Sequence, residues 1–489
     1  METPSTTPTV DLPPTPPQPP PPPIETVVVP ASPPPNPTFP NPTPTSPPPS
    51  PSGNPFGKFL KLIIVLVVLT ALFFGGKFAW ETFSASKEVT ITYWGLWEND
   101  ANVRNLIADF ESSNPKIKVQ YTKQSPKQYR ERLQAAIARG EGPDVFRFHN
   151  TWVVMLARDL SRVPATIMTA TEFSSSFYPV ATGDLVSGST IYGIPLMFDG
   201  LALYYNEDLL STAGVSVPTT WNDVLDMVPK LTVKGEEGIV TSAIALGTTG
   251  NVEHFSDIFA TMIMQNGAKL TNLTTKEAQD ALIFYHKFAD PSDPVYTWDE
   301  SLDNSISAFA NGRVAMILAP SWRVFDIKQI NPNIRFQTAP IPQLPGNTIT
   351  WASYWVEGVS NKTQYEEQAW QFVKYLTSRE TATKLYTEIS KSRLFGEPYG
   401  RVDLGTSLAS DPLVGAYIKQ AATAKSFPLA SRTFDNGIND KLIKYLEDAV
   451  NSVSSGNSPQ KALETAQSGF TQVLSSYGLS SASTAPSSQ

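Results

Sequence analysis

The sequence contains no cysteine and only three histidines among its 489 residues. The absence of cysteine excludes disulfide bonds, thiolate metal sites, cysteine nucleophiles and a lipid-modified cysteine anchor, and it leaves the redox compartment open. The histidines, His149, His254 and His286, are widely separated, which disfavours an imidazole metal site or a Ser-His-Asp triad. We therefore expect no catalytic residue, no bound metal and no cofactor.

Basic residues are too few and too scattered to suggest a polyanionic partner. The chain has 37 Lys and Arg against 45 Asp and Glu, a net charge of -8. Nucleic-acid binding needs clustered cations to neutralise phosphates, so we expect no nucleic-acid partner. The 41% apolar and 17% charged residues are ordinary for a globular protein, and the length allows two or three domains.

The two ends of the chain have compositions that cannot build a core. Residues 1–57 hold roughly half of the 44 prolines, mixed with Thr, Ser and Asn. Such a segment buries too little apolar surface to offset its ordering entropy. We predict a disordered, Pro-rich cytoplasmic tail, acting either as a solvated spacer or as a docking segment for proline-binding partners. The Ser-rich residues 479–489 are predicted to form a second disordered tail.

Residues 58–80 are predicted to form a single transmembrane signal anchor. No charged residue occurs between Leu62 and Gly76, and a helix of about 22 residues spans about 33 Å, enough for a hydrocarbon core of about 30 Å. Lys58 and Lys61 precede the apolar run, which places the N-terminus in the cytoplasm and the rest of the chain outside the membrane. Residues 81–88 then form a linker. A cleaved signal peptide remains the alternative, because Ser84-Ala85-Ser86 suits a peptidase.

An α/β pattern begins after the linker. Strand-like segments at residues 89–94, 117–121 and 145–148 alternate with helical apolar spacings. This alternation predicts βαβ units and a mostly parallel sheet. Ligands bind such sheets beyond the carboxyl ends of the strands, so the loops 95–100 and 149–152 are candidates for a binding site.

Residues 191–206 read as a strand interrupted by Pro195 and Gly200, with the carboxylate Asp199 inside the interruption. Such a break is typical of a chain that crosses between two lobes over a cleft. We predict that residues 355–360 make the return crossing.

Three further local patterns concern strand and helix boundaries. Residues 350–358 read as one strand-like run, which would put Trp351 and Trp355 on the same face. Capping boxes are predicted at Thr220 and at Thr363, each with an acidic residue three positions later.

The order of motifs over about four fifths of the chain resembles the extracellular solute-binding proteins of ABC importers, the sugar-binding group that includes maltose-binding protein. The motifs that carry the resemblance are Trp94-Gly-Leu-Trp97, Phe110-Glu-Ser-Ser-Asn-Pro115, Gly140-Glu-Gly-Pro-Asp-Val-Phe146, Tyr192-Gly-Ile-Pro-Leu196, Leu203-Tyr-Tyr-Asn-Glu-Asp-Leu209, Pro218-Thr-Thr-Trp221 and Phe309-Ala-Asn-Gly-Arg-Val-Ala-Met316 with Ser321-Trp322. The chain departs from the family before Val89, where the family usually has a cleaved signal or a lipid-modified cysteine.

The resemblance implies a two-lobe periplasmic-binding-protein-like α/β fold, with a hinge between lobes that are each a mostly parallel sheet flanked by helices. Lobe 1 is expected to comprise residues 89–200 and 357–398, and lobe 2 residues 201–356 and 399–478. The implied partners are a small solute and the membrane permease, and we expect a monomer anchored to the lipid bilayer through residues 58–80.

Carbohydrate recognition combines aromatic faces against the C–H side of the sugar with carboxylates and amides for its hydroxyls. The loops and strand ends that offer such groups predict ligand contacts at Trp97, Glu98, His149, Asn150, Trp152, Asp199, Glu253, His254, Trp322, Arg323, Trp351, Tyr354 and Trp355. Asp199 and Trp322 match positions that commonly touch solute in the resembled family. Trp221 and Trp370 fall inside helical patterns, so we predict that they belong to the core.

The predicted function is a membrane-anchored extracellular solute-binding protein that delivers a sugar or oligosaccharide to an ABC permease. An anchored carbohydrate sensor or adhesion module without an importer fits the same fold. A glycoside hydrolase using two of Glu98, Asp199 and Glu357 is the third alternative, since such hydrolysis needs a pair of carboxylates. The family pattern explains these carboxylates without catalysis, so we expect no enzyme.

Overall fold

The computed structural model describes residues 66–70, 88–346 and 348–479. Contacts divide the chain into two units, Met1–Ala79 and Trp80–Gln489, and within the first unit residues 66–70 are described, as a helix. Almost all of the predicted tails, membrane segment and linker lies outside the described residues. Within the described ranges, no helix is both long and apolar enough to cross a bilayer.

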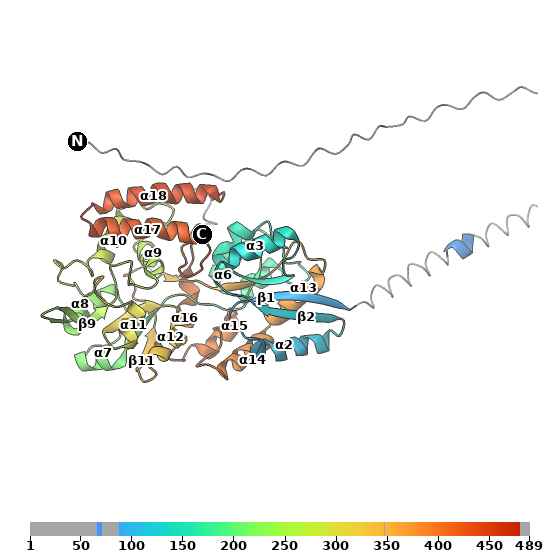
Figure 1. The fold of residues 1–489 in the computed structure, drawn as a ribbon, viewed down its shortest axis with the longest axis horizontal. Coiled ribbons are helices and arrows are strands. Elements are labelled where there is room, and N and C mark those ends of the chain that lie inside the picture. The colour runs from blue at the N-terminus through green and yellow to red at the C-terminus, as the bar shows by residue number, and fades with distance from the viewer. Residues whose placement is uncertain (1–65, 71–87, 347, 480–489) are drawn as a thin grey trace, which may run out of the picture. The chain divides into compact units, whose positions relative to one another are not determined.

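The second unit is built on two five-stranded sheets (Figure 1). The first sheet has the order β2-β1-β3-β13-β6. Its strands are β1 (Val89–Gly95), β2 (Ile117–Lys123), β3 (Val145–His149), β6 (Ile194–Pro195) and β13 (Trp355–Val359). Strand β1 runs parallel to β2 and β3, as predicted, but β13 runs antiparallel to β3 and β6.

The second sheet has the order β11-β7-β10-β9-β8. Its strands are β7 (Ala202–Asn206), β8 (Val233–Gly235), β9 (Gly238–Ile244), β10 (Val314–Ala319) and β11 (Phe336–Ala339). Of its pairings, β9 with β10 is parallel and the others are antiparallel. Both sheets are therefore mixed, and the prediction of mostly parallel sheets was wrong. The reason is that strands β7 and β13, which enter a sheet from the other lobe, run against their neighbours.

The predicted single strand over residues 350–358 is two strands in different sheets. Strand β12 (Thr350–Trp351) pairs with β14 (Ala424–Lys425), whereas Trp355 begins β13 in the first sheet. Trp351 and Trp355 are therefore not neighbours on one strand face, because the chain passes between the two sheets in the intervening residues. A separate hairpin joins β4 (Val186–Ser187) to β5 (Thr190–Ile191).

Helices connect the strands and pack against them (Figure 1). Those before β6 are α2 (Asp100–Ser113), α3 (Tyr129–Arg139), α4 (Val153–Leu156), α5 (Ala170–Ser176), α6 (Pro179–Leu185) and the 3-10 turn η1 (Asn150–Trp152). Those between β7 and β11 are α7 (Glu207–Ala213), α8 (Trp221–Leu231), α9 (Phe255–Gln265), α10 (Lys276–His286), α11 (Ser305–Ala310) and α12 (Arg323–Ile330).

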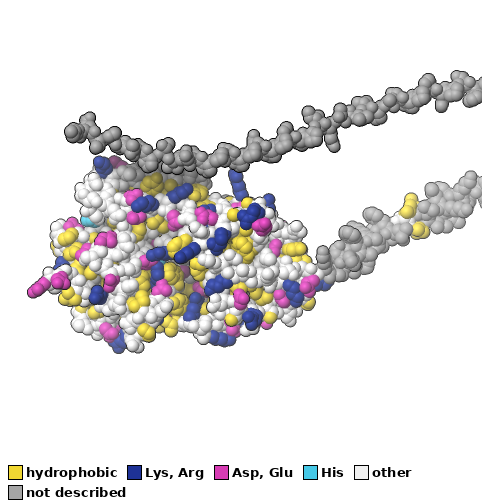
Figure 2. All heavy atoms as spheres, viewed as in Figure 1, with side chains coloured by type: hydrophobic (Ala, Val, Ile, Leu, Met, Phe, Trp, Pro, Cys, Tyr) yellow, Lys and Arg dark blue, Asp and Glu magenta, His cyan; other side chains and the backbone are white. Residues whose placement is uncertain are grey.

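The helices after β13 are α13 (Glu366–Leu376), α14 (Arg379–Ser390), α15 (Val402–Gly405), α16 (Gly415–Gln420), α17 (Ile438–Ser454) and α18 (Pro459–Ser476), with 3-10 turns η2 (Thr406–Leu408) and η3 (Ala421–Thr423). Helices α17 and α18 lie side by side, next to α9 and α10 (Figure 1). On the face shown in Figure 2, basic and acidic side chains are interspersed with apolar ones. Trp221 and Trp370 are buried, as predicted.

Two crossing segments run beside each other between the sheets. Residues 196–201 join β6 to β7, and residues 352–354 join β12 to β13. Gly200 bridges Ala352, and the main-chain NH of Ser353 donates to the Asp199 carbonyl at 3.0 Å. A Cβ on Gly200 would lie 1.9 Å from the Trp351 carbonyl oxygen, so only glycine fits this approach.

The predicted return crossing at residues 355–360 was placed a few residues too late. Residues Trp355–Val359 are strand β13, and Trp355 and Val356 pair with His149 and Phe148 inside the first sheet. The chain has therefore completed its return before it reaches Trp355.

Candidate functional site

A cavity of about 880 Å³ is lined on one side by residues of the first sheet and on the other by loops and helices that connect strands of the second sheet. The crossing segments and a loop before α17 also contribute to its lining. Most of the predicted contact residues line it: Trp97, His149, Asp199, Glu253, His254, Trp322, Arg323, Trp351 and Trp355. The strand-end loops identified from the sequence thus meet at one place. The volume is at the upper end of what is usual for small-molecule pockets, roughly 300–1,000 Å³.

The wall on the side of the first sheet is aromatic. The ring of Trp355 stands edge-to-face against Trp97, with centroids 5.4 Å apart, and against His149, with centroids 5.1 Å apart. Burial lowers the pKa of His149 to about 3, so the imidazole is neutral, and its Nε2 lies 3.0 Å from the Ser353 hydroxyl oxygen. Edge-to-face packing of this kind fixes the orientation of each ring. The wall is therefore rigid and largely apolar.

The opposite wall carries Trp322, which lies in the short connection from β10 to α12, immediately before the first residue of α12. Its side chain is 39% exposed, the highest value among the tryptophans that line the cavity. The guanidinium carbon of Arg323 lies 4.0 Å from the centroid of the Trp322 ring, and the His254 ring meets it edge-on at 5.6 Å. The cation covers one face of Trp322, and the exposed part of the residue remains available to a solute.

Two buried carboxylates reach the cavity between these walls. Asp199 accepts hydrogen bonds from the Ser321 NH at 3.0 Å, the Ser321 hydroxyl at 2.9 Å and the Gly200 NH at 2.8 Å. Burial raises its pKa to about 7, against the opposing effect of these hydrogen bonds. Asp257 accepts from Trp351 Nε1 at 2.8 Å and from the Ser431 NH at 3.0 Å, and burial raises its pKa to about 6.

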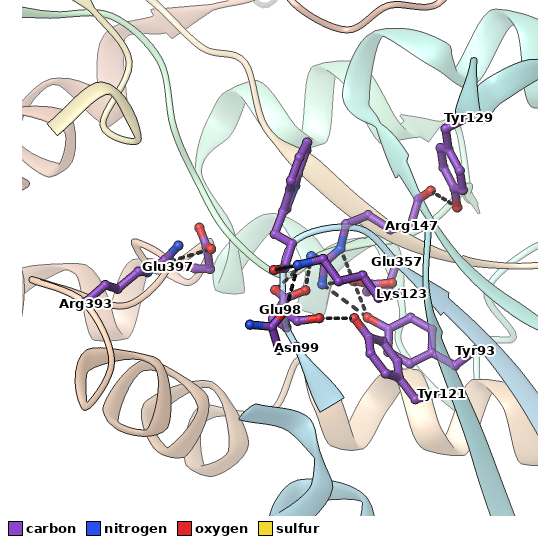
Figure 3. A network of polar contacts seen from close by, with 11 residues as sticks. Tyr93, Glu98, Asn99, Tyr121, Lys123, Tyr129, Arg147, Glu357, Arg393 and Glu397 are labelled. Atoms are coloured by element: carbon purple, nitrogen blue, oxygen red, sulfur yellow. Dashed lines mark hydrogen bonds and ion pairs between the residues drawn. The ribbon is translucent and has the colours of Figure 1, made fainter. Parts of the chain in front are cut away.

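Glu98 does not line the cavity, contrary to the prediction. It belongs to a buried cluster behind the aromatic wall, drawn in Figure 3. Arg147 contacts Glu98 at 2.7 Å and Glu357 at 2.7 Å, and the Tyr93 hydroxyl donates to Glu357 at 3.0 Å. Burial lowers the pKa of Arg147, but the two carboxylates outweigh it and raise that pKa well above its ordinary value. Glu98 and Glu357, two of the three carboxylates considered for hydrolysis, thus both pair with Arg147 in the core.

Asn150, Tyr354 and Trp152 also lie behind the cavity wall. Asn150 Nδ2 donates to Asp184 at 2.9 Å, and the Tyr354 hydroxyl donates to the same carboxylate at 2.7 Å. Asp184 also receives the Ser426 hydroxyl, so it ties three distant segments together. Trp152 is completely buried and packs edge-on against Trp355 at 5.4 Å. These residues support the wall from behind, which the sequence alone did not reveal.

The loop at residues 431–436 was missed by the sequence analysis. Arg432 and Phe434 both have left-handed φ values, 62° and 50°, which are uncommon outside glycine. Phe434 is 41% exposed and lines the cavity, as does Thr433, whose buried hydroxyl has no hydrogen-bond partner among the described residues. The turn signal Asp435-Asn-Gly437 predicts a loop in the sequence, but it does not indicate that the loop lies at the cavity.

Arg393 lines the cavity as well. It pairs with Glu397 at 2.5 Å, and its guanidinium carbon lies 4.7 Å from the centroid of the Phe325 ring on α12. Burial raises the pKa of Glu397. Within the described residues, no group of three or more His, Asp or Glu side chains is placed to hold a metal ion.

Two lobes with an aromatic and carboxylate-lined cavity between them define a two-lobe solute-binding protein. The family model described as "Bacterial extracellular solute-binding protein" matches residues 94–383, more than half of the chain. The chain belongs to this family.

A curated protein and several solved structures are similar to the chain. The multiple sugar-binding protein of Streptococcus mutans is 27% identical over 319 residues, which cover 62% of this chain and 75% of the relative. The fold resembles the sugar-binding protein MalE of Xanthomonas citri, with a TM-score of 0.65, 22% identity and coverage of 79% of this chain and 98% of that one. It also resembles an ABC transporter solute-binding protein of Thermotoga lettingae bound with α-D-tagatose, with a TM-score of 0.60, 22% identity and coverage of 80% and 100%. These structural likenesses establish the two-lobe fold.

Proposed function

We propose that the protein captures a carbohydrate in the 880 Å³ cavity and delivers it to an ABC permease. The observation that carries the proposal is Trp322, which is 39% exposed and lines a cavity whose other wall is also aromatic. A sugar ring has an apolar C–H face that such a platform covers, and hydroxyls at its edge that polar neighbours bind. The named relatives are sugar-binding and solute-binding proteins of transporters rather than enzymes, which supports a binding role.

Membrane anchoring is part of the proposal. Residues 66–70 are helical, and Leu66, Val67, Val68 and Leu69 are each at least half exposed, on successive positions that cover every side of the helix. An apolar surface of this kind suits lipid. A linker of about eight residues reaches at most about 28 Å, so the tether would keep the receptor near its permease at high local concentration.

We further propose that the lobes close on the sugar about the two crossing segments, residues 196–201 and 352–354. Hinge motion concentrates changes in short linking segments and leaves each lobe intact. Small-angle scattering of the full-length chain in detergent, with and without a saturating sugar, would report the change. Superimposable curves at saturation contradict the hinge.

The central experiment is a thermal-shift screen of the purified full-length chain against neutral mono-, di- and oligosaccharides, polyols and, as a contrast set, amino acids. A ligand at a hundred times its Kd stabilises the folded state by about 2.7 kcal/mol, which shifts the unfolding temperature measurably. We expect stabilisation by at least one sugar and by none of the contrast set. Stabilisation by amino acids alone contradicts the carbohydrate proposal.

Two further measurements separate the alternatives. Incubation with labelled oligosaccharides should give no product, and turnover of any of them would establish a glycosidase instead. Alkaline carbonate washing of membranes should leave the full-length chain in the pellet, whereas release of a protein that begins near residue 87 would establish a cleaved signal peptide.

A further inference from the structure

The charged groups beside Trp322 form a single network centred on Glu253. The Glu253 carboxylate pairs with both Arg323 and Arg432, and its Oε2 accepts from Asn304 Nδ2 at 2.9 Å. The side chain of Glu253 is only 6% exposed. Protein donors already occupy this carboxylate, so its main partners are the two arginines rather than a solute.

Arg323 is fixed in position by three partners. Its Nε donates to His254 Nε2 at 3.0 Å, its Nη1 contacts Asp326 at 2.7 Å, and its Nη2 contacts Glu253. Burial, with the two nearby arginines, lowers the pKa of His254 well below its ordinary value, so the imidazole is neutral and can accept this bond. A planar guanidinium held on its edges presents its flat face to Trp322 and sets the orientation of the ring.

Arg432 connects the same carboxylate to the loop at residues 431–436. The left-handed backbone of Arg432 and Phe434 is strained for these residue types and persists only where surrounding contacts hold it. Glu253 supplies one such contact from lobe 2. On the other side, the Asp435 carbonyl accepts from Arg130 Nε of helix α3 at 2.6 Å. The loop is therefore bonded to both lobes, and Glu253 is its attachment next to Trp322.

We propose that Glu253 is a positioning residue that couples two walls of the cavity: through Arg323 it orients Trp322, and through Arg432 it makes that orientation depend on the loop at residues 431–436. The coupling deepens the proposed function, and its consequence for sugar binding rests on that function. A solute that contacts Phe434 or Thr433 would thereby tighten the placement of the Trp322 platform.

The test needs no sugar. The full-length chain is labelled with 5-fluorotryptophan, and the ¹⁹F resonance of Trp322 is assigned by its loss in Trp322→Phe. We expect Glu253→Gln, Arg323→Met and Arg432→Met each to move this resonance by more than its own linewidth. Arg432→Met is the diagnostic variant, because Arg432 pairs with Glu253 and makes the loop's ionic contact with the network. The adjacent Ser431 also contacts His254, which packs against Trp322, so the double variant has to show that the effect passes through Glu253. The double variant Glu253→Gln with Arg432→Met should match Glu253→Gln alone, because the two residues act on one pathway.

A matched control is Arg162→Met, which removes a guanidinium 4.2 Å from the Tyr192 ring, a pair outside the cavity lining. It should leave the Trp322 resonance in place. An unmoved resonance in folded Arg432→Met protein overturns the proposal, and so do additive shifts in the double variant. If Glu253→Gln fails to fold, Arg323→Met and Arg432→Met still decide the matter. Absence of sugar binding would overturn the proposed function and leave this coupling standing.

Discussion

Two arginine and glutamate clusters stand on opposite sides of the cavity, and they differ chiefly in burial. Around Arg147, all three charged side chains are at most 2% exposed. Around Glu253, Arg323 is 13% exposed and Arg432 is 47% exposed. The same residue types therefore serve as a sealed support in one place and as part of the cavity wall in the other. Access to solvent, rather than residue chemistry, separates the two roles.

The largest effect is expected from Arg147→Met. Removing this cation leaves Glu98 and Glu357 unpaired in the core, and breaking a buried ion pair in this way costs about 3–5 kcal/mol of folding free energy. Denaturant unfolding should show this loss. Arg139→Met is the control, because Arg139 is 60% exposed and paired with Glu141 at the surface. Equal unfolding free energies for the two variants would mean that the buried cluster contributes no more to folding stability than the exposed pair.

The pH dependence of the free energy of unfolding tests the raised pKa of Asp199, a buried carboxylate that pairs with no arginine among the described residues. Asp199 receives hydrogen bonds from neutral donors of Gly200 and Ser321. Because its folded pKa is raised from 3.8 to about 7, the folded state keeps a proton that the unfolded chain has lost. This stabilisation is complete below the unfolded pKa and is lost as the pH rises through about 7.

The free energy of unfolding should therefore fall between pH about 4 and about 7, by at most about 1.4 kcal/mol per pH unit from this group. Urea titrations across this window should show a shallower fall in Asp199→Asn. Asp223→Asn is the control, since hydrogen bonds from the Thr219 and Thr220 main chain lower the pKa of Asp223 and place its titration below the window. An unchanged slope in Asp199→Asn contradicts the assignment.

Trp322→Ala should separate binding from folding. Loss of the stacking face should weaken the binding of the tightest sugar found in the thermal-shift screen by more than tenfold, or about 1.4 kcal/mol. Because the ring is 39% exposed, the free energy of unfolding should change far less than in Arg147→Met. Isothermal calorimetry measures the first quantity and denaturant titration the second. Wild-type affinity in this variant would remove Trp322 from the site.

The smallest effect on stability is expected from Arg432→Met, the same substitution as Arg147→Met in the other cluster. Arg432 is 47% exposed, and half-exposed ion pairs contribute at most about 1 kcal/mol. Its unfolding midpoint should therefore stay close to that of the unaltered chain. A loss as large as that of Arg147→Met would show that the Glu253 network is structural and would erase the contrast between the two clusters.

Local signals in the sequence were reliable where a few adjacent residues decide the outcome. The capping box at Thr220 is present, with Thr220 and Asp223 bonded reciprocally at the start of α8. The one predicted at Thr363 was wrong. Helix α13 begins at Glu366, while the Thr363 hydroxyl donates to Asp144 at 2.5 Å. Local spacing predicted that the Thr363 side chain caps the helix, but it instead bonds a residue 219 positions away in the chain.

The residues at the cavity show the same difference between what local sequence predicts and what distant contacts decide. Trp97 and His149 lie at the cavity because the parallel strands β1 and β3 end at one edge of the first sheet. Trp355 reaches the same edge for a different reason, as the first residue of the antiparallel strand β13. Glu98 and Tyr354 occur in equally suitable loops but turn to Arg147 and Asp184. Whether a polar side chain faces a cavity or a buried partner depends on residues that are distant in sequence.

The sequence by itself determined the alternation of strands and helices and the crossing at Asp199, because apolar periodicity and Pro or Gly breaks act within a few residues. The two-lobe family followed from the resemblance of its motifs, in their order, to those of known solute-binding proteins. Only the tertiary structure decided the mixed pairing of both sheets, the loop at residues 431–436 in the cavity wall and the different burial of the two ion clusters. Each of these depends on which distant segments meet, and burial then sets the pKa of a carboxyl and the accessibility of an arginine.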